Sequence, residues 1–140
     1  MLSPVISEEG MGKTITAQLD IFLRGDEDQK MAVTPKNVIN KALATGPTTE
    51  YTATNCRAII DKMTVTNTSA ANVTFGVNIV PNGGSAGTSN YVIITRAVAP
   101  GETYTCPEAV GQALNPGDFI VSRASTGAVL AMVAAVREIT

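Results

Sequence analysis

Residues 73–81 have the sequence VTFGVNIVP, and this stretch decides the fold class. Every second residue from 73 to 79 is apolar, while threonine, glycine and asparagine fill the positions between them. A two-residue period places the apolar side chains on one face of a β-strand. Pro81 cannot donate a hydrogen bond to a neighbouring strand, so the strand is expected to end there. The predicted inward row is Val73, Phe75, Val77 and Ile79.

The segments on either side of this strand are also rich in β-forming residues. Residues 58–66 are followed by a loop of turn-forming residues at 67–72, which predicts a hairpin between 58–66 and 73–80. Residues 82–90 contain three glycines and predict a flexible loop, and a further strand follows at 91–98.

The C-terminal part continues the same alternation of strands and turns. Pro100-Gly101 and Pro116-Gly117 each place glycine after proline, as in a type II turn. Residues 128–136 have a composition that also suits a helix, but their position after a strand favours a buried strand. About seven or eight short strands with almost no helix predict an all-β fold, and we expect a jelly-roll sandwich over residues 46–140. The last strands are expected at 102–106, 118–125 and 128–139.

Residues 1–45 are predicted to form an N-terminal extended arm or strand with an acidic loop. Residues 14–23 alternate between apolar and polar side chains, and the polar segment 24–30 follows them. Residues 34–43 fit a short helix with Thr34 as N-cap and Pro35 in the first turn, although the same residues could instead lead into an extended segment. The apolar row of the arm is Ile15, Ala17, Leu19, Ile21 and Leu23.

The charge of the chain is low for its length. Charged residues make up 16% of the sequence, and residues 51–140 contain five acidic and five basic side chains. Part of a surface this neutral is expected to be covered by other subunits, unless the protein is simply rich in threonine. The net charge of −2 and the absence of a Lys/Arg run predict no nucleic-acid partner. The nine-residue apolar stretch at 128–136 is too short for a transmembrane helix, so no membrane partner is predicted.

The residues that most enzymes use are scarce. There is no histidine, which removes the commonest general base and zinc ligand, so no enzymatic activity, cofactor or metal is predicted. Asp26-Glu27-Asp28 lacks the ligand spacing of an EF-hand. No secretory signal is visible, so synthesis in a reducing cytoplasm is expected to leave Cys56 and Cys106 as thiols.

Several stretches, taken in order, resemble a family of phage virion β-sandwich proteins. They are residues 51–69, 77–88, 99–103 and 114–118, so the likeness covers roughly residues 46–140. Within that family the chain is most similar to the capsid cement (decoration) proteins of tailed podoviruses. The resemblance implies a jelly-roll homodimer that binds the major capsid protein and catalyses no reaction. It does not extend to residues 1–45 and does not identify the capsid contacts.

The functional hypothesis is a structural virion protein on the outer capsid surface, made in the host cytoplasm, that clamps neighbouring major capsid subunits. The alternative is a tail or head-fibre component that binds host-surface carbohydrate, although an aromatic content of 4% without tryptophan argues against it. The arm strand either pairs with a neighbouring subunit or is an ordinary first strand of the sandwich. If it contacts a partner, the candidate residues are Ile15, Leu19, Ile21 and Leu23.

Overall fold

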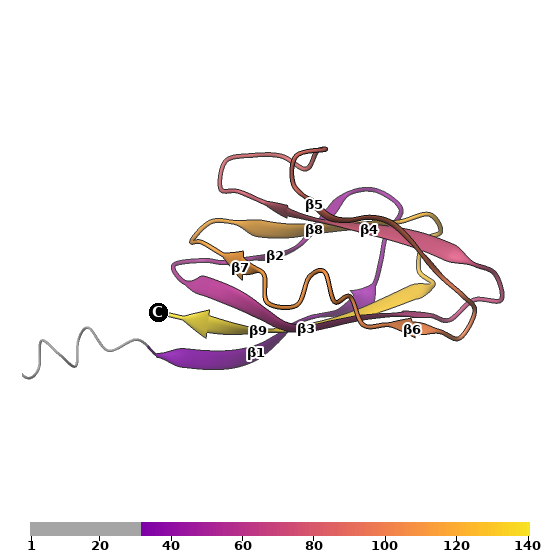
Figure 1. The fold of residues 1–140 in the computed structure, drawn as a ribbon, viewed down its shortest axis with the longest axis horizontal. Coiled ribbons are helices and arrows are strands. Elements are labelled where there is room, and N and C mark those ends of the chain that lie inside the picture. The colour runs from indigo at the N-terminus through magenta and orange to yellow at the C-terminus, as the bar shows by residue number, and fades with distance from the viewer. Residues whose placement is uncertain (1–31) are drawn as a thin grey trace, which may run out of the picture. The chain divides into compact units, whose positions relative to one another are not determined.

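The computed structural model describes residues 32–140, which form two antiparallel β-sheets (Figure 1). One sheet has the strand order β1-β9-β3-β6, with β7 also pairing with β3, and the other has the order β2-β8-β4-β5. The described residues contain no helix, which confirms the all-β prediction. The strands are β1 (Val33–Ala42), β2 (Thr48–Thr52), β3 (Arg57–Asn67), β4 (Val73–Val80), β5 (Tyr91–Val98), β6 (Thr103–Tyr104), β7 (Ala113–Leu114), β8 (Phe119–Ala124) and β9 (Leu130–Ile139).

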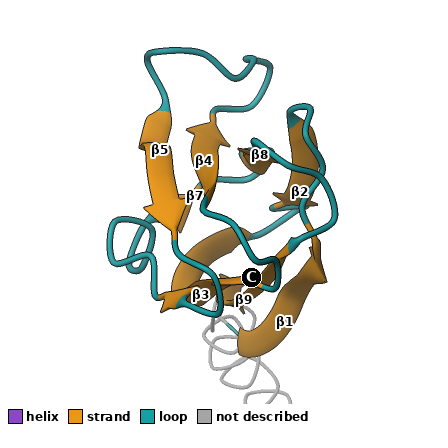
Figure 2. Cartoon of the chain, turned by 90° about the vertical axis from the view of Figure 1, so that its right-hand side faces the viewer, coloured by secondary structure: helices purple, strands orange, loops and turns teal. Residues whose placement is uncertain are grey.

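The two sheets lie one above the other (Figure 2). The apolar side chains of their strands form one core between them. The predicted inward row of β4 is confirmed for Val73, Phe75 and Val77, which are buried, while Ile79 is half-buried and packs against the same core. The buried row of β9 faces it from the other sheet and confirms that residues 130–139 form a strand. Its members are Leu130, Met132, Ala134 and Val136.

The predicted hairpin between residues 58–66 and 73–80 is wrong. β3 pairs with β9, β6 and β7, whereas β4 pairs with β8 and β5. The loop at 68–72 therefore carries the chain from one sheet to the other, and Asn67 Nδ2 fixes it by donating to the carbonyl oxygens of Ala71 at 2.7 Å and Val98 at 2.8 Å. An alternating pattern specifies which face of a strand is buried, but not which strand lies beside it.

The predicted helix at residues 34–43 is also wrong, because these residues form most of the edge strand β1. The register against β9 shifts between Asn37 and Ile39, so one extra residue stands in β1 at that point. This bulge brings the consecutive side chains of Val38 and Ile39 into contact with the core, and consecutive apolar residues imitate a helical period. Pro35 is tolerated because an edge strand needs fewer backbone donors than a central one.

The two Pro-Gly turns are confirmed. Gly101 and Gly117 have positive φ angles of 76° and 92°, as the third residue of a type II turn requires. The amides of Glu102 and Asp118 each donate to the carbonyl oxygen three residues earlier, at 2.9 Å in both turns.

Residues 1–31 are outside the part of the chain that the structure describes. The predicted strand at 14–23 and the acidic loop at 24–30 therefore remain predictions. Residues 33–42 were predicted as part of the arm, but they form strand β1 and pair with β9. β1 ends the strand order of its sheet, so only one of its two edges is paired among the described residues.

Candidate functional site

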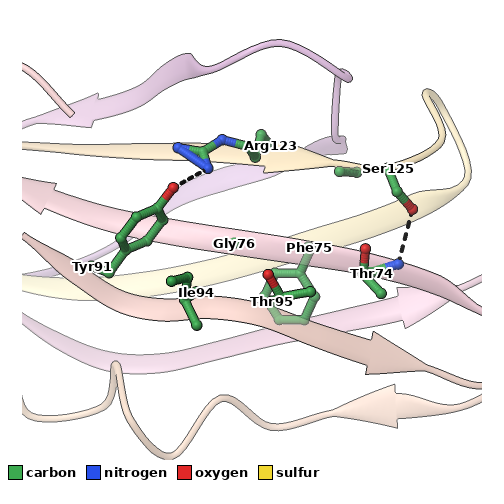
Figure 3. Close-up of a pocket in the computed structure, with 9 residues that line it drawn as sticks. Thr74, Phe75, Gly76, Tyr91, Ile94, Thr95, Arg123 and Ser125 are labelled. Carbon is green, nitrogen blue, oxygen red and sulfur yellow. Dashed lines mark hydrogen bonds between the residues drawn. The ribbon is translucent and has the colours of Figure 1, made fainter. Parts of the chain in front are cut away.

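A hollow of about 220 Å³ lies on the outer face of the sheet β2-β8-β4-β5 (Figure 3). It spans β4, β5 and the C-terminal end of β8. Figure 3 shows Arg123 and Tyr91 at one end of the hollow and Ser125 and Thr74 at the other. The lining residues are Thr74, Phe75, Gly76, Tyr91, Ile94, Thr95, Arg123, Ala124 and Ser125.

The hollow exists because of a bulge between β4 and β5. Phe75 pairs with Arg96 and Val77 pairs with Ile93, so Ile94 and Thr95 together stand opposite the single residue Gly76. A Cβ atom on Gly76 would lie 2.8 Å from the carbonyl oxygen of Ile94. Only glycine therefore permits this approach of β5, and its missing side chain leaves the floor of the hollow open.

One end of the hollow is formed by the guanidinium group of Arg123. Arg123 pairs with Gly76 across β8 and β4, so its half-buried side chain lies on the outer face beside the open floor. Its guanidinium carbon is 5.1 Å from the centre of the Tyr91 ring, and Nη1 donates to the Tyr91 hydroxyl. Nη2 lies 3.4 Å from Asn78 Oδ1. Arg123 forms no salt bridge with any carboxylate of residues 32–140.

The other end of the hollow carries hydroxyl groups. Ser125 Oγ accepts a hydrogen bond from the Thr74 amide at 3.0 Å, so its own proton is free to be donated. Thr74 and Thr95 add two further hydroxyls to the lining, which contains no aspartate or glutamate. The hollow therefore offers a positive charge and several O–H donors with no fixed negative charge.

The opposite surface of the sandwich is a second candidate, which we call the neutral face. It is the outer side of β1, β9 and β3, where Asn40 and Thr64 flank Val133 in register. Val133 is 40% exposed, and the charged residues Asp61, Lys62 and Arg137 lie together toward one end of the face. The neutral face comprises Asn40, Ala42, Thr64, Thr66, Ala131, Val133 and Ala135.

The most deeply buried carboxylate of residues 32–140 is structural. The side chain of Glu50, at the bulge of β2 against β8, is fully buried. Its Oε2 accepts a hydrogen bond from Ser122 Oγ at 2.5 Å. Its Oε1 has only an ionic contact, at 2.9 Å, with Nζ of the half-exposed Lys41 on β1, in a geometry that makes no hydrogen bond. Lys41 and Glu50 thus join the edge strands of the two sheets.

We expect Lys41→Met to lower the free energy of unfolding by about 1–3 kcal/mol, because it leaves a buried carboxylate without a counter-charge. The matched control is Lys36→Met, which removes a salt bridge between Lys36 and Glu138 near the surface and should cost about 0.5 kcal/mol or less. Urea denaturation measures both variants. Equal effects would show that Lys41 does not compensate the charge of Glu50.

Both cysteines are buried free thiols, as expected from the sequence. Burial, with a smaller contribution from Glu108, raises the pKa of the Cys106 thiol to about 12. At pH 8 almost no thiolate is present, so Cys106 in a Cys56→Ala variant should react with iodoacetamide at least about 100-fold more slowly in the native state than in urea. Mass spectrometry follows the alkylation, and equal rates in both states would contradict the burial.

The sequence-predicted contact residues Ile15, Leu19, Ile21 and Leu23 all lie outside the described residues. The hollow was not predicted from sequence. The one signal available was Gly76 inside a strand, since an interior glycine often marks a bulge. Nothing in the sequence links Arg123 to Tyr91, which are brought together by the pairing of β4 with both β8 and β5.

Comparison with known proteins leaves the family open, because neither a scan against protein-family models nor a search of curated proteins gave a match. Within residues 32–140 there is no helix with the length and apolar character that crossing a membrane requires. The same residues contain no cluster of three His, Cys, Asp or Glu side chains placed to hold a metal ion.

Proposed function

We propose that this chain is a structural virion protein of a tailed bacteriophage. It reinforces the capsid by binding the outer surface and clamping neighbouring major capsid subunits. The resemblance of residues 46–140 to phage virion β-sandwich proteins, and within them to capsid cement proteins, suggested this function. The neutral face is the structural observation that carries it. The proposal includes localisation on the outside of the virion and no catalytic role.

The neutral face has the composition of the centre of a protein interface. Its residues are small and uncharged, and the pleated surface of three paired strands offers many short contacts. Charged residues are depleted at interface centres because burying an unpaired charge is unfavourable. One such face forms only modest contacts, but two or more linked faces raise the overall affinity through effective concentration.

The gain from linked faces also favours a homodimer, which is the commonest symmetric assembly. Sedimentation velocity tests this oligomeric state.

The finer topology that we propose is a jelly roll. Two four-strand paths, β1-β9-β3-β6 and β2-β8-β4-β5, support it. Consecutive strands such as β1 and β2, or β3 and β4, lie in different sheets, which is how a chain winds as a jelly roll. Among the described residues, this winding places no further strand over the outer face of either sheet, so these faces suit contacts with other subunits.

The test is a charge placed at the centre of the neutral face. We expect Val133→Glu to reduce binding to capsids purified from a strain lacking this protein by about tenfold or more, because the carboxylate is desolvated in the contact. Thr88→Glu is the control, since Thr88 is exposed on the loop that joins β4 and β5 of the other sheet. Co-sedimentation measures binding, and circular dichroism checks that both variants are folded. Equal binding by the two variants would remove the neutral face from the contact.

The alternative, a fibre component that binds carbohydrate, has the hollow at Arg123 as a structural candidate. Sugars stack on exposed aromatic faces, but of the two aromatic residues that line the hollow, Phe75 is buried and Tyr91 is half-buried. A glycan array separates the two functions, because selective glycan binding supports the fibre component and no binding supports the cement protein.

A further inference from the structure

We infer that the hollow at Arg123 is a carboxylate-binding site, and that its occupant is an aspartate or glutamate side chain of a protein partner. This inference goes beyond capsid binding and does not depend on it, because the argument rests on the chemistry of the hollow. It uses a different face of the molecule from the neutral face.

The first argument is the charge of Arg123. A half-buried guanidinium loses part of its hydration, and structures compensate for this loss with a carboxylate or another anion. Within residues 32–140, Lys36, Lys41 and Arg137 each form a salt bridge with a carboxylate, whereas Arg123 does not. Arg57, Lys62 and Arg96 also form none, but they are exposed and keep their hydration. Arg123 has only the neutral oxygens of Tyr91 and Asn78. Its remaining N–H groups are available to a ligand.

The second argument is the set of donors around the hollow. Tyr91 accepts a hydrogen bond from Arg123, so its own proton can be donated to a ligand beside the guanidinium. Ser125, at the opposite end of the hollow, can also donate its hydroxyl proton, because its oxygen accepts a hydrogen bond from the Thr74 amide. A carboxylate accepts several hydrogen bonds and donates none, which matches a lining without aspartate or glutamate.

The third argument separates a protein carboxylate from an acidic sugar. Arg123 meets Tyr91 at the hydroxyl edge of its ring, so the charged and polar groups of these two residues lie together at one end of the hollow. Ile94, which is 65% exposed, lines the same hollow and offers an aliphatic contact. A carboxylate on a short aliphatic stem, as in glutamate, satisfies both features.

The experiment is an NMR titration of the isotope-labelled full chain with sodium acetate at constant ionic strength. We expect saturable shifts of the Arg123 Nε–Hε and Tyr91 ring signals in the millimolar range, and no such shifts with acetamide, the neutral analogue. Arg123→Met should weaken acetate binding, followed at Tyr91, by about tenfold or more. Arg57→Met is the matched control, since Arg57 is exposed on β3 and has no salt bridge among the described residues. It should leave the titration unchanged.

The chain carries its own acidic segment, Asp26-Glu27-Asp28, so the titration is repeated on D26N/E27Q/D28N. Saturable binding in this variant alone would support a carboxylate site but overturn the assignment to a protein partner, because the chain's own carboxylates would then be the occupant. Absence of binding in both backgrounds, or unchanged binding in Arg123→Met, would overturn the site. Titrations with N-acetylglutamate methylamide and with glucuronate distinguish the source. Tighter binding of glucuronate would overturn the assignment to a protein carboxylate.

Discussion

Phe75→Ala should lower the free energy of unfolding by about 3–5 kcal/mol, the largest effect that we expect from a single substitution in this chain. Phe75 is 2% exposed at the centre of β4. Its ring makes an edge-to-face contact with Tyr104, with 6.2 Å between ring centres, and the guanidinium carbon of Arg96 lies 4.2 Å from the centre of the Tyr104 ring. The substitution removes the aromatic contact and leaves a cavity where both sheets meet.

Urea denaturation measures this effect, and the melting temperature should fall by about 10 °C or more. The control is Ile94→Ala on the neighbouring strand, where the side chain is 65% exposed, so the change should stay within about 0.5 kcal/mol. An unchanged melting curve for Phe75→Ala would place this side chain outside the core.

The second large effect is expected from deleting residues 1–24. Residues 33–140 already supply all the strands of both described sheets, so the shortened chain should remain a soluble β domain. If the strand at 15–23 pairs with a neighbouring subunit, the deletion should lower the affinity for capsids by about tenfold or more, because one of several linked contacts is lost.

Circular dichroism and capsid co-sedimentation together test the deletion. A shorter deletion of residues 1–9 is the control, because it keeps the whole apolar row from Ile15 to Leu23. Full capsid binding by a folded 1–24 deletion would remove the arm from the contact. An unfolded product would instead show that residues 15–23 form an ordinary strand of the sandwich.

The sequence was most informative about where the strands lie, because runs of β-forming residues are bounded by turn-forming residues. Residues 91–98 were predicted as a strand and form β5 over the same residues, and the predicted strands around residues 58–66 and 118–125 correspond to β3 and β8. Alternation reports which side chains face the core, because one face of each strand is buried. It contains no information on strand order, so the separation of β3 from β4 was not predicted.

Bulges explain the other differences between the sequence-based predictions and the structure. At Val38 one extra residue turned a strand into an apparent helix. At Ile94 and Thr95 two residues opposite Gly76 produced a hollow for which the sequence has no motif. A bulge depends on the partner strand, and partners here are far apart in sequence, so local patterns do not reveal it.

The central position of β9 has a consequence for how the protein is made. β9 is the last strand in the described part of the sequence, yet it lies between β1 and β3 in the sheet. Val33, at the start of the first described strand, pairs with Ile139, at the end of the last one. During synthesis, β1 and β3 leave the ribosome long before the strand that joins them. The sheet can therefore close only after translation has passed residue 139, and folding should be slow because its contacts span most of the domain. Until then the nascent chain exposes unpaired strand edges, which makes it a substrate for chaperones and sensitive to premature termination.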